Sequence, residues 1–437
     1  MARFHTLKVK DIRRETAEAV SVAFEVPPMQ QPEYLFKQGQ YITLKMTLNG
    51  QEVRRSYSLC TSPFTEKELR VAVKEVQGGL VSTHINRHMK VGDAVEVMTP
   101  MGNFHTVLSG NQKKNYVLFA GGSGITPMMS ILKSVLYVEK QSTVTLVYAN
   151  KDEASTIFKA ELDKIASVES RLKLVYVFEQ PNTEVSALQK GLISVDRVPA
   201  LLEQFGGVNA DEYFICGPGP MMENIKQGLT NLKIDAAKIH IEYFSSVVDA
   251  VNKAAGESRG GDVNAKVTVI QYGIETDFDL ETAGITILDA AIEAGIDAPF
   301  SCKGAVCCTC RAKVIEGKVK MDANFALTDA EVEEGFVLTC QAHPLTEKVV
   351  LDYDAWSVNN LGQIMVNCKW LMRWQNIDSK LKIESWELKV ESWGVYITLY
   401  PLPSRRESHE QFRSTISFGC GKPTIIVNGK SLLSGEN

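Results

Sequence analysis

The sequence predicts a multidomain protein with an antiparallel β-barrel, then an α/β domain with a doubly wound parallel sheet, then a small α+β domain. Three observations predict this order. Short alternating runs separated by turn residues fill the first part, apolar runs alternate with helical stretches from about residue 115, and a mixed pattern follows residue 264. The length of 437 residues is enough for two to four domains.

The antiparallel β-barrel is expected over residues 1–105. Apolar and polar residues alternate in QYITLKMTL (40–48) and LRVAVKEV (69–76), and turn residues lie between such runs. Alternation of this kind is typical of strands with one buried face. Such strands build a barrel or a sandwich, and the barrel is the form expected here.

The doubly wound α/β domain is expected over residues 106–246. Apolar runs and helical stretches alternate in the order YVLFA, PMMSILKSVLYVEK, TVTLVYA, IFKAELDKIA, LKLVYVF and YFICG. This alternation is typical of a parallel sheet. Residues 115–132 carry no charge and nearly reach membrane-spanning length, but GGSG interrupts them. A buried strand–turn–helix unit is therefore expected there rather than a membrane span.

The remaining chain divides at composition changes. VNKAAGESRGGD (251–262) is small, polar and rich in glycine, so a linker is expected at residues 247–263. A small α+β domain is expected over residues 264–355, where strand-like KVTVIQY precedes the amphipathic helix ILDAAIEAGI. The tail, residues 356–437, holds all five tryptophans, and its residues from 357 carry a net charge of +3 against −8 before them. Its structure is not predicted, and it is either a separate module or a segment not selected with the rest.

The overall charge and the N-terminus exclude several classes of function. A net charge of −5 offers no general attraction to nucleic acid or to anionic lipid. The N-terminal MARFHTLKVKDIRRE has no apolar core, so no signal peptide is expected. A cytoplasmic location is therefore expected, where structural disulfides are disfavoured.

The strongest motif is a group of cysteines in SCKGAVCCTC (301–310). Cys302, Cys307 and Cys310 have the spacing C-x4-C-x2-C, and Cys340 follows in FVLTCQA. This is the plant-type [2Fe–2S] spacing, in which four thiolates hold two irons. The sequence therefore predicts an iron–sulfur cluster on these four cysteines.

Other interpretations of the cysteines fit less well. A zinc site usually uses two C-x2-C pairs, and a single such pair is present. A disulfide framework does not suit the expected compartment. Cys308 is surplus to the cluster and is expected to be a packing thiol.

Two motifs in the first domain indicate a flavin nucleotide. In RRSYSLC (54–60), an arginine can clamp a phosphate, a tyrosine can lie against an aromatic ring, and a serine can reach a ring nitrogen. In GGLVSTHINRHM (78–89), glycines and Ser82 or Thr83 precede a helical stretch, which favours a pyrophosphate site at a helix N-terminus. An ordinary strand and a plain capped helix are the alternatives.

Two glycine-rich loops in the second domain indicate a dinucleotide. LFAGGSGITPMMSIL (118–132) runs from a strand through glycines into a helix, with the pattern G-x-G-x-x-P in place of the usual G-x-G-x-x-G. YFICGPGPMM (213–222) repeats this order at the end of the same predicted sheet. A tight turn explains either loop alone, but the pair in one domain favours a nucleotide site.

The chain resembles the ferredoxin–NADP reductase superfamily with a C-terminal plant-type ferredoxin domain. The resemblance rests on the order of its motifs, which are RSYS, GGLVS, GGSGITP, CGPGPMM and then the cysteine spacing. RRSYSLC, VMTPMGNF, EYF and the cysteine segment resemble most closely the reductase subunits of phenylacetyl-CoA epoxidase complexes. The resemblance covers residues 1 to about 355 and implies a β-grasp fold for the third domain. It implies an oxidoreductase that uses FAD, a [2Fe–2S] cluster and NADPH, with NADH also possible.

The resemblance also implies roles for single residues. It assigns to FAD Arg55, Ser56, Tyr57, Ser58, Gly79, Ser82 and Phe244. It assigns to the nicotinamide nucleotide Gly121, Gly122, Gly124, Thr126, Pro127, Lys151, Cys216, Gly217 and Pro218. It places Ser58, Cys216 and Glu242 at the site of hydride transfer. Lys151, in YANKDEAS, stands where the family usually has an arginine, and a lysine can still meet a 2′-phosphate.

The resemblance implies that NADPH gives a hydride to FAD and that single electrons then pass through the cluster to a di-iron oxygenase, the ring epoxidase of phenylacetyl-CoA. A first alternative is the reductase of another aromatic or alkane oxygenase. A second alternative, from another class, is a non-enzymatic scaffold that binds zinc.

Overall fold

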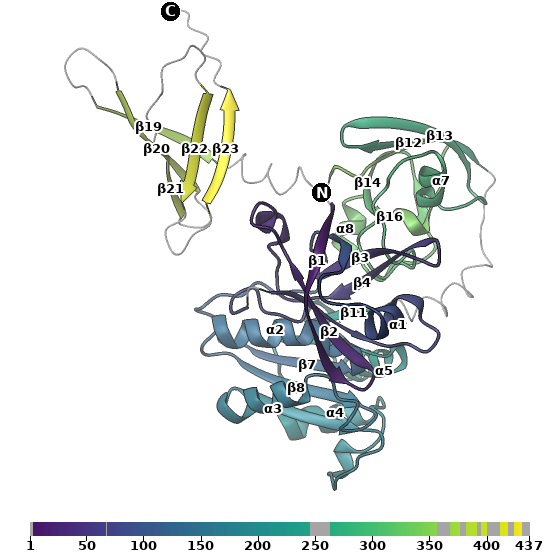
Figure 1. Cartoon of the computed structure of the whole chain (residues 1–437), viewed down its shortest axis with the longest axis vertical. Coiled ribbons are helices and arrows are strands. Elements are labelled where there is room, and N and C mark those ends of the chain that lie inside the picture. Colours follow the sequence, from purple (N-terminus) through teal and green to yellow (C-terminus); the bar gives the residue numbers. More distant parts are fainter. Residues whose placement is uncertain are drawn as a thin grey trace, which may run out of the picture. The chain divides into compact units, whose positions relative to one another are not determined.

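The computed structural model describes residues 3–66, 68–244 and 263–355 and, beyond them, the backbone of five strands. The chain divides into two compact units, Met1–Tyr353 and Asp354–Asn437. Figure 1 shows the elements along the chain. The linker predicted at 247–263 lies outside the described residues except for its last residue.

The first domain is the predicted antiparallel barrel. Its six strands are β1 (Phe4–Thr16), β2 (Ala19–Glu25), β3 (Tyr41–Leu48), β4 (Gln51–Ser58), β5 (Leu69–Lys74) and β6 (Ala94–Met98). They pair in the order β4-β3-β6-β1-β2-β5, and every pairing is antiparallel. A bridge between Leu59 and Val71 brings the end of β4 back to β5, which closes the sheet on itself. The short helices η1 (Gln31–Tyr34) and α1 (Leu80–Arg87) complete the domain.

The second domain is the predicted parallel α/β sheet. Its strands are β7 (Asn115–Gly121), β8 (Thr143–Asn150), β9 (Leu172–Phe178), β10 (Glu212–Cys216) and β11 (Ile239–Glu242), in the order β11-β10-β7-β8-β9. Its helices are η2 (Gly122–Gly124), α2 (Ile125–Val138), α3 (Lys159–Val168), η3 (Ala187–Gln189), α4 (Arg197–Phe205), α5 (Gly219–Asn231) and η4 (Ala236–Lys238). Side chains of α2 and α3 join one buried core and those of α4 and α5 another, so helices cover both faces of the sheet.

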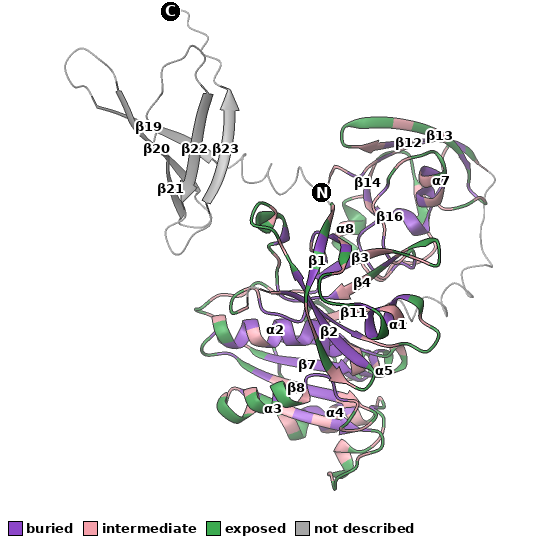
Figure 2. Cartoon of the chain, viewed as in Figure 1, coloured by how far each residue is buried: buried purple, intermediate pink, exposed green. Residues whose placement is uncertain are grey.

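The uncharged stretch 115–132 forms β7, η2 and the first part of α2. Its strand is buried, and α2 is buried over most of its length, whereas α3 presents an exposed face (Figure 2). This confirms the prediction of a buried strand–turn–helix unit. Across the described ranges, no helix is long and apolar enough to cross a membrane.

The third domain is a mixed sheet with a helix across it, in agreement with the β-grasp prediction. Its strands are β12 (Asn264–Gln271), β13 (Ile274–Glu281), β14 (Arg311–Glu316), β15 (Val319–Met321), β16 (Phe336–Leu338), β17 (Ala342–Pro344) and β18 (Lys348–Asp352). The main sheet has the order β13-β12-β18-β14-β16, with β12 and β18 parallel. The helices are α7 (Ile287–Glu293), α8 (Asp329–Glu333) and η7 (Thr339–Gln341), and the cysteine loop lies between α7 and β14.

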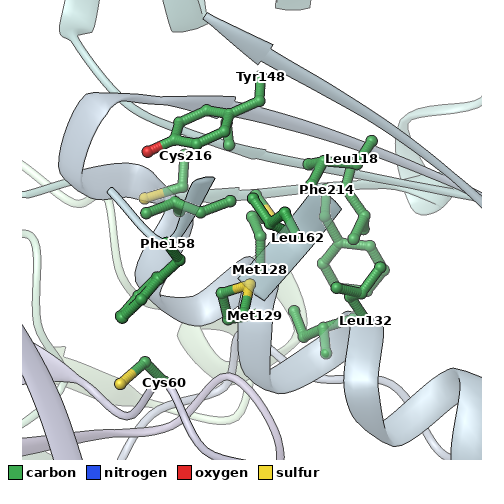
Figure 3. Close-up of a cluster of buried hydrophobic side chains, with 14 of the residues drawn as sticks. Cys60, Leu118, Met128, Met129, Leu132, Tyr148, Phe158, Leu162, Phe214 and Cys216 are labelled. Atoms are coloured by element: carbon green, nitrogen blue, oxygen red, sulfur yellow. The ribbon is translucent and has the colours of Figure 1, made fainter. Parts of the chain in front are cut away.

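The barrel and the α/β domain share one hydrophobic core. Cys60 and Phe104 of the barrel belong to the same buried cluster as Met128, Phe158 and Phe214 of the α/β domain (Figure 3). Because dense cores tolerate little relative movement, the shared core fixes the two domains against each other.

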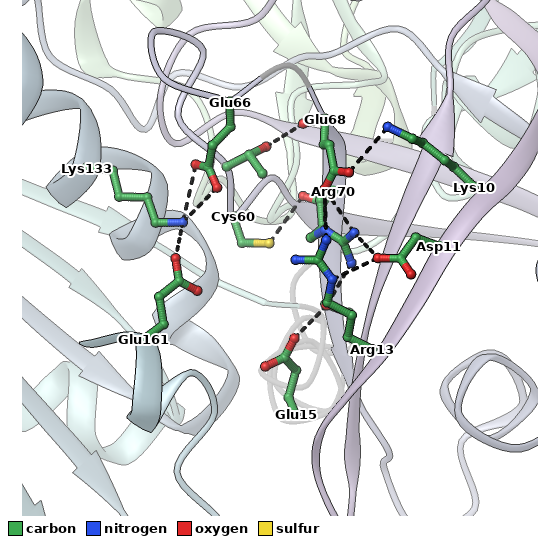
Figure 4. A network of polar contacts seen from close by, with 12 residues as sticks. Lys10, Asp11, Arg13, Glu15, Cys60, Glu66, Glu68, Arg70, Lys133 and Glu161 are labelled. Atoms are coloured by element: carbon green, nitrogen blue, oxygen red, sulfur yellow. Dashed lines mark hydrogen bonds and ion pairs between the residues drawn. The ribbon is translucent and has the colours of Figure 1, made fainter. Parts of the chain in front are cut away.

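Polar contacts cross the same boundary. The Lys133 ammonium of α2 lies 3.0 Å from the Glu66 carboxylate of the barrel and 2.6 Å from Glu161 of α3 (Figure 4). In the barrel itself, buried Arg70 bridges Asp11 at 2.5 Å and Glu68 at 2.9 Å. Charged groups that are largely removed from solvent are stable when they are paired, so the Lys133–Glu66 ion pair helps to hold the boundary in one geometry.

The second unit contains two small antiparallel sheets. β19 (Cys368–Gln375), β20 (Lys382–Val390) and β21 (Val395–Leu399) form one, and β22 (Gln411–Ser417) and β23 (Thr424–Lys430) form the other.

We predict that a chain ending at Asp354 keeps the fold of the first unit. Tyr353 is its last buried anchor: its backbone N–H donates to Ile270 and its hydroxyl donates to Thr339 Oγ1 at 2.8 Å. The thermal midpoint of unfolding, followed by far-ultraviolet circular dichroism, should change by less than about 2 °C. A shift of this size corresponds to a small fraction of the free energy of folding. A much lower midpoint would show that the tail contributes to the core.

Candidate functional site

Strand β4 carries the RSYS motif with alternating side chains. Arg55 is exposed, and its guanidinium donates to the Arg54 carbonyl at 2.7 Å. Tyr57 is half-buried against the barrel core, and burial raises the pKa of its hydroxyl. Ser56 and Ser58 alternate with them and so face the other side of the strand. An exposed guanidinium beside an oriented tyrosine ring fits a phosphate and an aromatic ring system.

The three predicted catalytic residues lie together. Ser58 Oγ donates a hydrogen bond of 2.9 Å to Glu242 Oε2 at the end of β11. Glu242 is paired in register with Cys216 at the end of β10. Burial raises the pKa of the Glu242 carboxyl to about 8 and the pKa of the Cys216 thiol well above its ordinary value. Both groups are therefore uncharged near neutral pH, and Glu242 is close to releasing its proton.

The two glycine loops pack directly on each other. A Cβ on Gly124 would lie 2.1 Å from the Cys216 carbonyl oxygen, and one on Gly121 would lie 2.6 Å from Pro218. A side chain at Gly124 is therefore excluded by backbone. Gly122 has a φ of +50° and open space where a side chain would stand, so its backbone is free to approach a ligand. The loops meet at the carboxyl ends of β7 and β10, where ligands bind in open α/β sheets.

The other predicted nucleotide residues flank these loops. Thr126 Oγ1 donates to the Ser123 carbonyl at 3.0 Å, and Pro127 is buried as the third residue of α2. Gly217 lies against the backbone of Gly121. Phe244, beyond β11, packs on the core shared by the two domains.

The predicted pyrophosphate site at GGLVS differs from expectation in detail. Helix α1 begins at Leu80 with Gly79 as its N-cap, so Ser82 lies inside the first turn rather than before the helix. The Ser82 hydroxyl accepts from the Val76 N–H at 3.1 Å and donates to the Gly79 carbonyl at 3.4 Å. Ser82 therefore stabilises the turn, and the backbone N–H groups of the first turn remain to meet an anion.

Lys151 follows β8 with an exposed side chain. Its acidic neighbour Glu153 accepts hydrogen bonds from the backbone N–H groups of Asn182 and Thr183 and from the Thr183 hydroxyl. These bonds lower the pKa of Glu153 to about 2. Its carboxylate thus holds a neighbouring loop, while Lys151 makes no ion pair within the described residues.

The four cluster cysteines form two thiol pairs. Hydrogen bonding with Cys302 lowers the pKa of the Cys307 thiol to about 6, and hydrogen bonding with Cys310 lowers the pKa of Cys340. Among the described residues, no three metal-ligating side chains converge on a single ion. Four thiols that lie in two pairs fit a group with two metal centres.

The backbone around the cysteines has an unusual conformation that is compatible with a bound iron–sulfur cluster. Lys303 and Ala305 have φ values of 51° and 63°, which are rare for residues with side chains. This conformation turns the Gly304 N–H toward Cys302 Sγ at 3.3 Å. N–H groups directed at sulfur stabilise the negative charge of a thiolate cluster.

The cysteine loop also contacts the barrel. Tyr41 begins β3 and is paired with Ser58; its hydroxyl lies 3.1 Å from Thr309 Oγ1 and 3.6 Å from Cys308 Sγ. Ser56 Oγ lies 2.7 Å from Ser301 Oγ. The contact therefore comes from the same pair of strands that carries the flavin motif.

Buried Arg54 reinforces this contact. Its guanidinium lies 4.0 Å from the centre of the Phe300 ring and 5.2 Å from that of Phe4. Sequence reasoning missed Tyr41, Arg54 and Ser301. For Arg54 the available signal was the double arginine of RRSYSLC, since two arginines in succession on a strand face opposite sides.

Three family models match the chain. They are described as "Oxidoreductase FAD-binding domain" over residues 6–106, "Oxidoreductase NAD-binding domain" over 118–227, and "2Fe-2S iron-sulfur cluster binding domain" over 269–345. These matches confirm the prediction of FAD, a nicotinamide nucleotide and a [2Fe–2S] cluster. The roles of single residues stay predictions.

Two curated relatives match over most of their length. The chain is 38% identical over 357 residues to one component of the 1,2-phenylacetyl-CoA epoxidase of Escherichia coli (strain K12), covering 81% of this chain and 99% of that protein. It is 35% identical over 357 residues to the 3-ketosteroid-9-alpha-monooxygenase, ferredoxin reductase component, of Mycobacterium tuberculosis (strain ATCC 25618 / H37Rv), covering 80% and 95%.

Among solved structures, an intact type IV self-sufficient cytochrome P450 monooxygenase matches with a TM-score of 0.57. The match has 21% identity and covers 80% of this chain and 41% of that one, so the likeness concerns the fold alone.

We predict that Glu242→Gln removes a pH dependence of stability. The pKa of Glu242 is about 8 in the folded chain against an ordinary value of 4.5, so the folded chain keeps a proton that the unfolded chain releases. The contribution of protonated Glu242 to the stability of the folded chain is complete below pH 4.5 and is lost as pH rises through about 8. The variant should therefore gain stability relative to the natural chain between these values, by at most about 1.4 kcal/mol per pH unit.

The measurement is the difference in urea midpoint between variant and natural chain at several pH values. Glu203→Gln, at an exposed position of α4, is the matched control and should show no trend. A constant difference for Glu242→Gln across the window would refute the assigned pKa.

We predict that Cys307→Ala loses the iron–sulfur cluster and keeps the flavin, because the missing thiolate belongs to one of the two pairs. Iron content and the visible spectrum measure the loss. Cys308→Ala, one residue away, should keep its iron. Full iron content in Cys307→Ala, equal to that of the natural chain, would exclude Cys307 as a ligand.

Proposed function

The chain belongs to the ferredoxin–NADP reductase superfamily of FAD- and NAD-binding oxidoreductases that carry a 2Fe-2S domain, and on this premise we propose that it is the reductase component of a multicomponent oxygenase. It takes electrons from NADPH and delivers them singly to an oxygenase. The observation that carries the proposal is the β3–β4 pair, which contacts the nucleotide domain through Ser58 and the cysteine loop through Ser56 and Tyr41.

When bound, FAD would supply hydride acceptance and the release of single electrons, and the [2Fe–2S] cluster would supply one-electron transfer. The chain positions them. Arg55 offers its guanidinium to the flavin phosphates, and Tyr57 presents its ring to the flavin. The backbone of Gly122 and Gly124, on which the Cys216–Pro218 turn packs, would hold the nicotinamide nucleotide.

Ser58 and Glu242 provide a proton path at the site of hydride transfer. The Ser58 hydroxyl is fixed by its 2.9 Å hydrogen bond to Glu242. With a pKa of about 8, Glu242 can take up or release a proton near neutral pH. Ser58 is buried and Glu242 is partly buried, which limits the access of water to the point where the hydride would pass.

For the oxygenase partner, we infer the di-iron ring epoxidase of phenylacetyl-CoA. Support comes from the 38% identity with a component of 1,2-phenylacetyl-CoA epoxidase across all three domains. The second candidate partner is the oxygenase component of a 3-ketosteroid 9α-monooxygenase, which the 35% identity with its ferredoxin reductase component supports. The alternative of a zinc-binding scaffold has no support from the matched family models, which describe domains that bind FAD, NAD and a 2Fe-2S cluster.

We infer NADPH as the preferred nucleotide and the cytoplasm as the location. Lys151 is exposed after β8, and its charge suits a 2′-phosphate. The acidic side chain of Glu153 is held by Asn182 and Thr183, so it does not compete for the ribose. Cysteine thiols stay reduced in the cytoplasm, as thiolate ligands of a cluster must.

We predict that the holoprotein supports epoxidation of phenylacetyl-CoA by purified epoxidase oxygenase, with one product formed for each NADPH oxidised. Parallel reactions contain the steroid oxygenase component with its substrate, and NADH in place of NADPH. Coupled turnover with the steroid oxygenase alone would move the proposal to the second candidate. Reduction of dyes without coupling to either oxygenase would contradict the proposed partner.

A further inference from the structure

The contact between the cysteine loop and the barrel is small and specific. The buried thiol of Cys307 and the partly buried thiol of Cys302 pack with Tyr41, Met98 and Met101 of the barrel. Tyr41, Cys308 and Thr309 are each less than 7% exposed. Two segments separated by 267 residues thus bury a polar contact together.

Tyr41 supplies the polar centre of this contact. Its hydroxyl is within hydrogen-bonding distance of both Thr309 Oγ1 and Cys308 Sγ, the two residues between Cys307 and Cys310. A buried hydroxyl that loses its hydrogen-bond partner costs free energy. The loop therefore has one preferred position on the barrel. Across the ladder, Tyr41 is the neighbour of Ser58, which touches Glu242.

Cys308 has a defined place in this arrangement. It is not needed for the two thiol pairs, and it is buried beneath Tyr41. A loop that left the barrel would separate the Cys308 thiol from Tyr41 and open it to solvent. It therefore reports on the contact independently of any acceptor.

We propose that Tyr41 is a positioning residue that holds the cluster-binding loop on the flavin-binding barrel through its hydroxyl, with Cys308 and Thr309 as its partners. The contact keeps the Cys302–Cys307 side of the loop against the barrel, the side from which electrons arrive. The functional consequence rests on the proposed reductase activity, but the contact itself does not.

The test is alkylation of Cys308 by iodoacetamide in the anaerobic full-length holoprotein, followed by peptide mapping. Tyr41→Phe keeps the ring and removes the hydroxyl. Loss of one buried hydrogen bond should raise the rate of Cys308 alkylation about fivefold. Cys60, buried in the core shared by the other two domains, should stay slow in the same sample.

Tyr34→Phe is the matched control. Tyr34 is a buried barrel tyrosine whose hydroxyl donates to the Val97 carbonyl at 2.6 Å, without touching the cysteine loop. It should leave Cys308 alkylation at the rate of the natural chain. Iron content confirms that each variant retains its cluster, so that faster alkylation reports on the contact and not on a lost cluster.

A second variant and a second readout complete the test. Arg54→Met removes the guanidinium that lies over Phe300, at another point of the same contact, and should also speed Cys308 alkylation. In Tyr41→Phe, NADPH should reduce the cluster more slowly relative to the flavin. The proposal is overturned if Tyr41→Phe and Tyr34→Phe alkylate Cys308 equally, or if Cys308 reacts no faster than Cys60 in both Tyr41→Phe and Arg54→Met. If the epoxidase assay fails, the alkylation rates still decide whether Tyr41 holds the loop on the barrel.

Discussion

The positions of the candidate site residues depend on the pairing of β3 with β4. In this ladder Tyr41 lies opposite Ser58 and Thr43 lies opposite Ser56. Because side chains alternate along a strand, Ser56 and Ser58 share one face while Arg55 and Tyr57 share the other. One pair of strands therefore presents an exposed arginine and a tyrosine ring on one side, and contacts to two other domains on the other. A shift of register by one residue would exchange these faces.

The nucleotide loops depend on a different constraint, which is close approach of backbone. Gly124 lies so near the Cys216 carbonyl that no side chain fits. The loop after β7 and the loop after β10 therefore form one surface. The shared core beneath them, with Cys60 from the barrel and Phe158 and Phe214 from the α/β domain, fixes that surface relative to the β3–β4 pair. Hydride transfer needs this rigidity, because small displacements of reacting atoms are costly.

Much of this arrangement could be predicted from the sequence because its signals are local. Strand and helix periodicity indicated the three domains, and the spacing of Cys302, Cys307 and Cys310 indicated the cluster. The roles of Tyr41 and Ser301 had no local signal, since each contact joins segments far apart in the chain. The position of Ser82 differed because α1 begins with Gly79 as its N-cap, which places the serine hydroxyl on the preceding turn.

In the proposed reductase, the β3–β4 ladder brings a flavin and an iron–sulfur cluster within reach of each other in a single chain. The most direct measurement is an anaerobic titration of the isolated holoprotein with NADPH, followed by visible absorbance and electron paramagnetic resonance. The account predicts that the flavin bleaches and that the signal of the reduced cluster appears without any added acceptor. A flavin that bleaches while the cluster stays oxidised would contradict it.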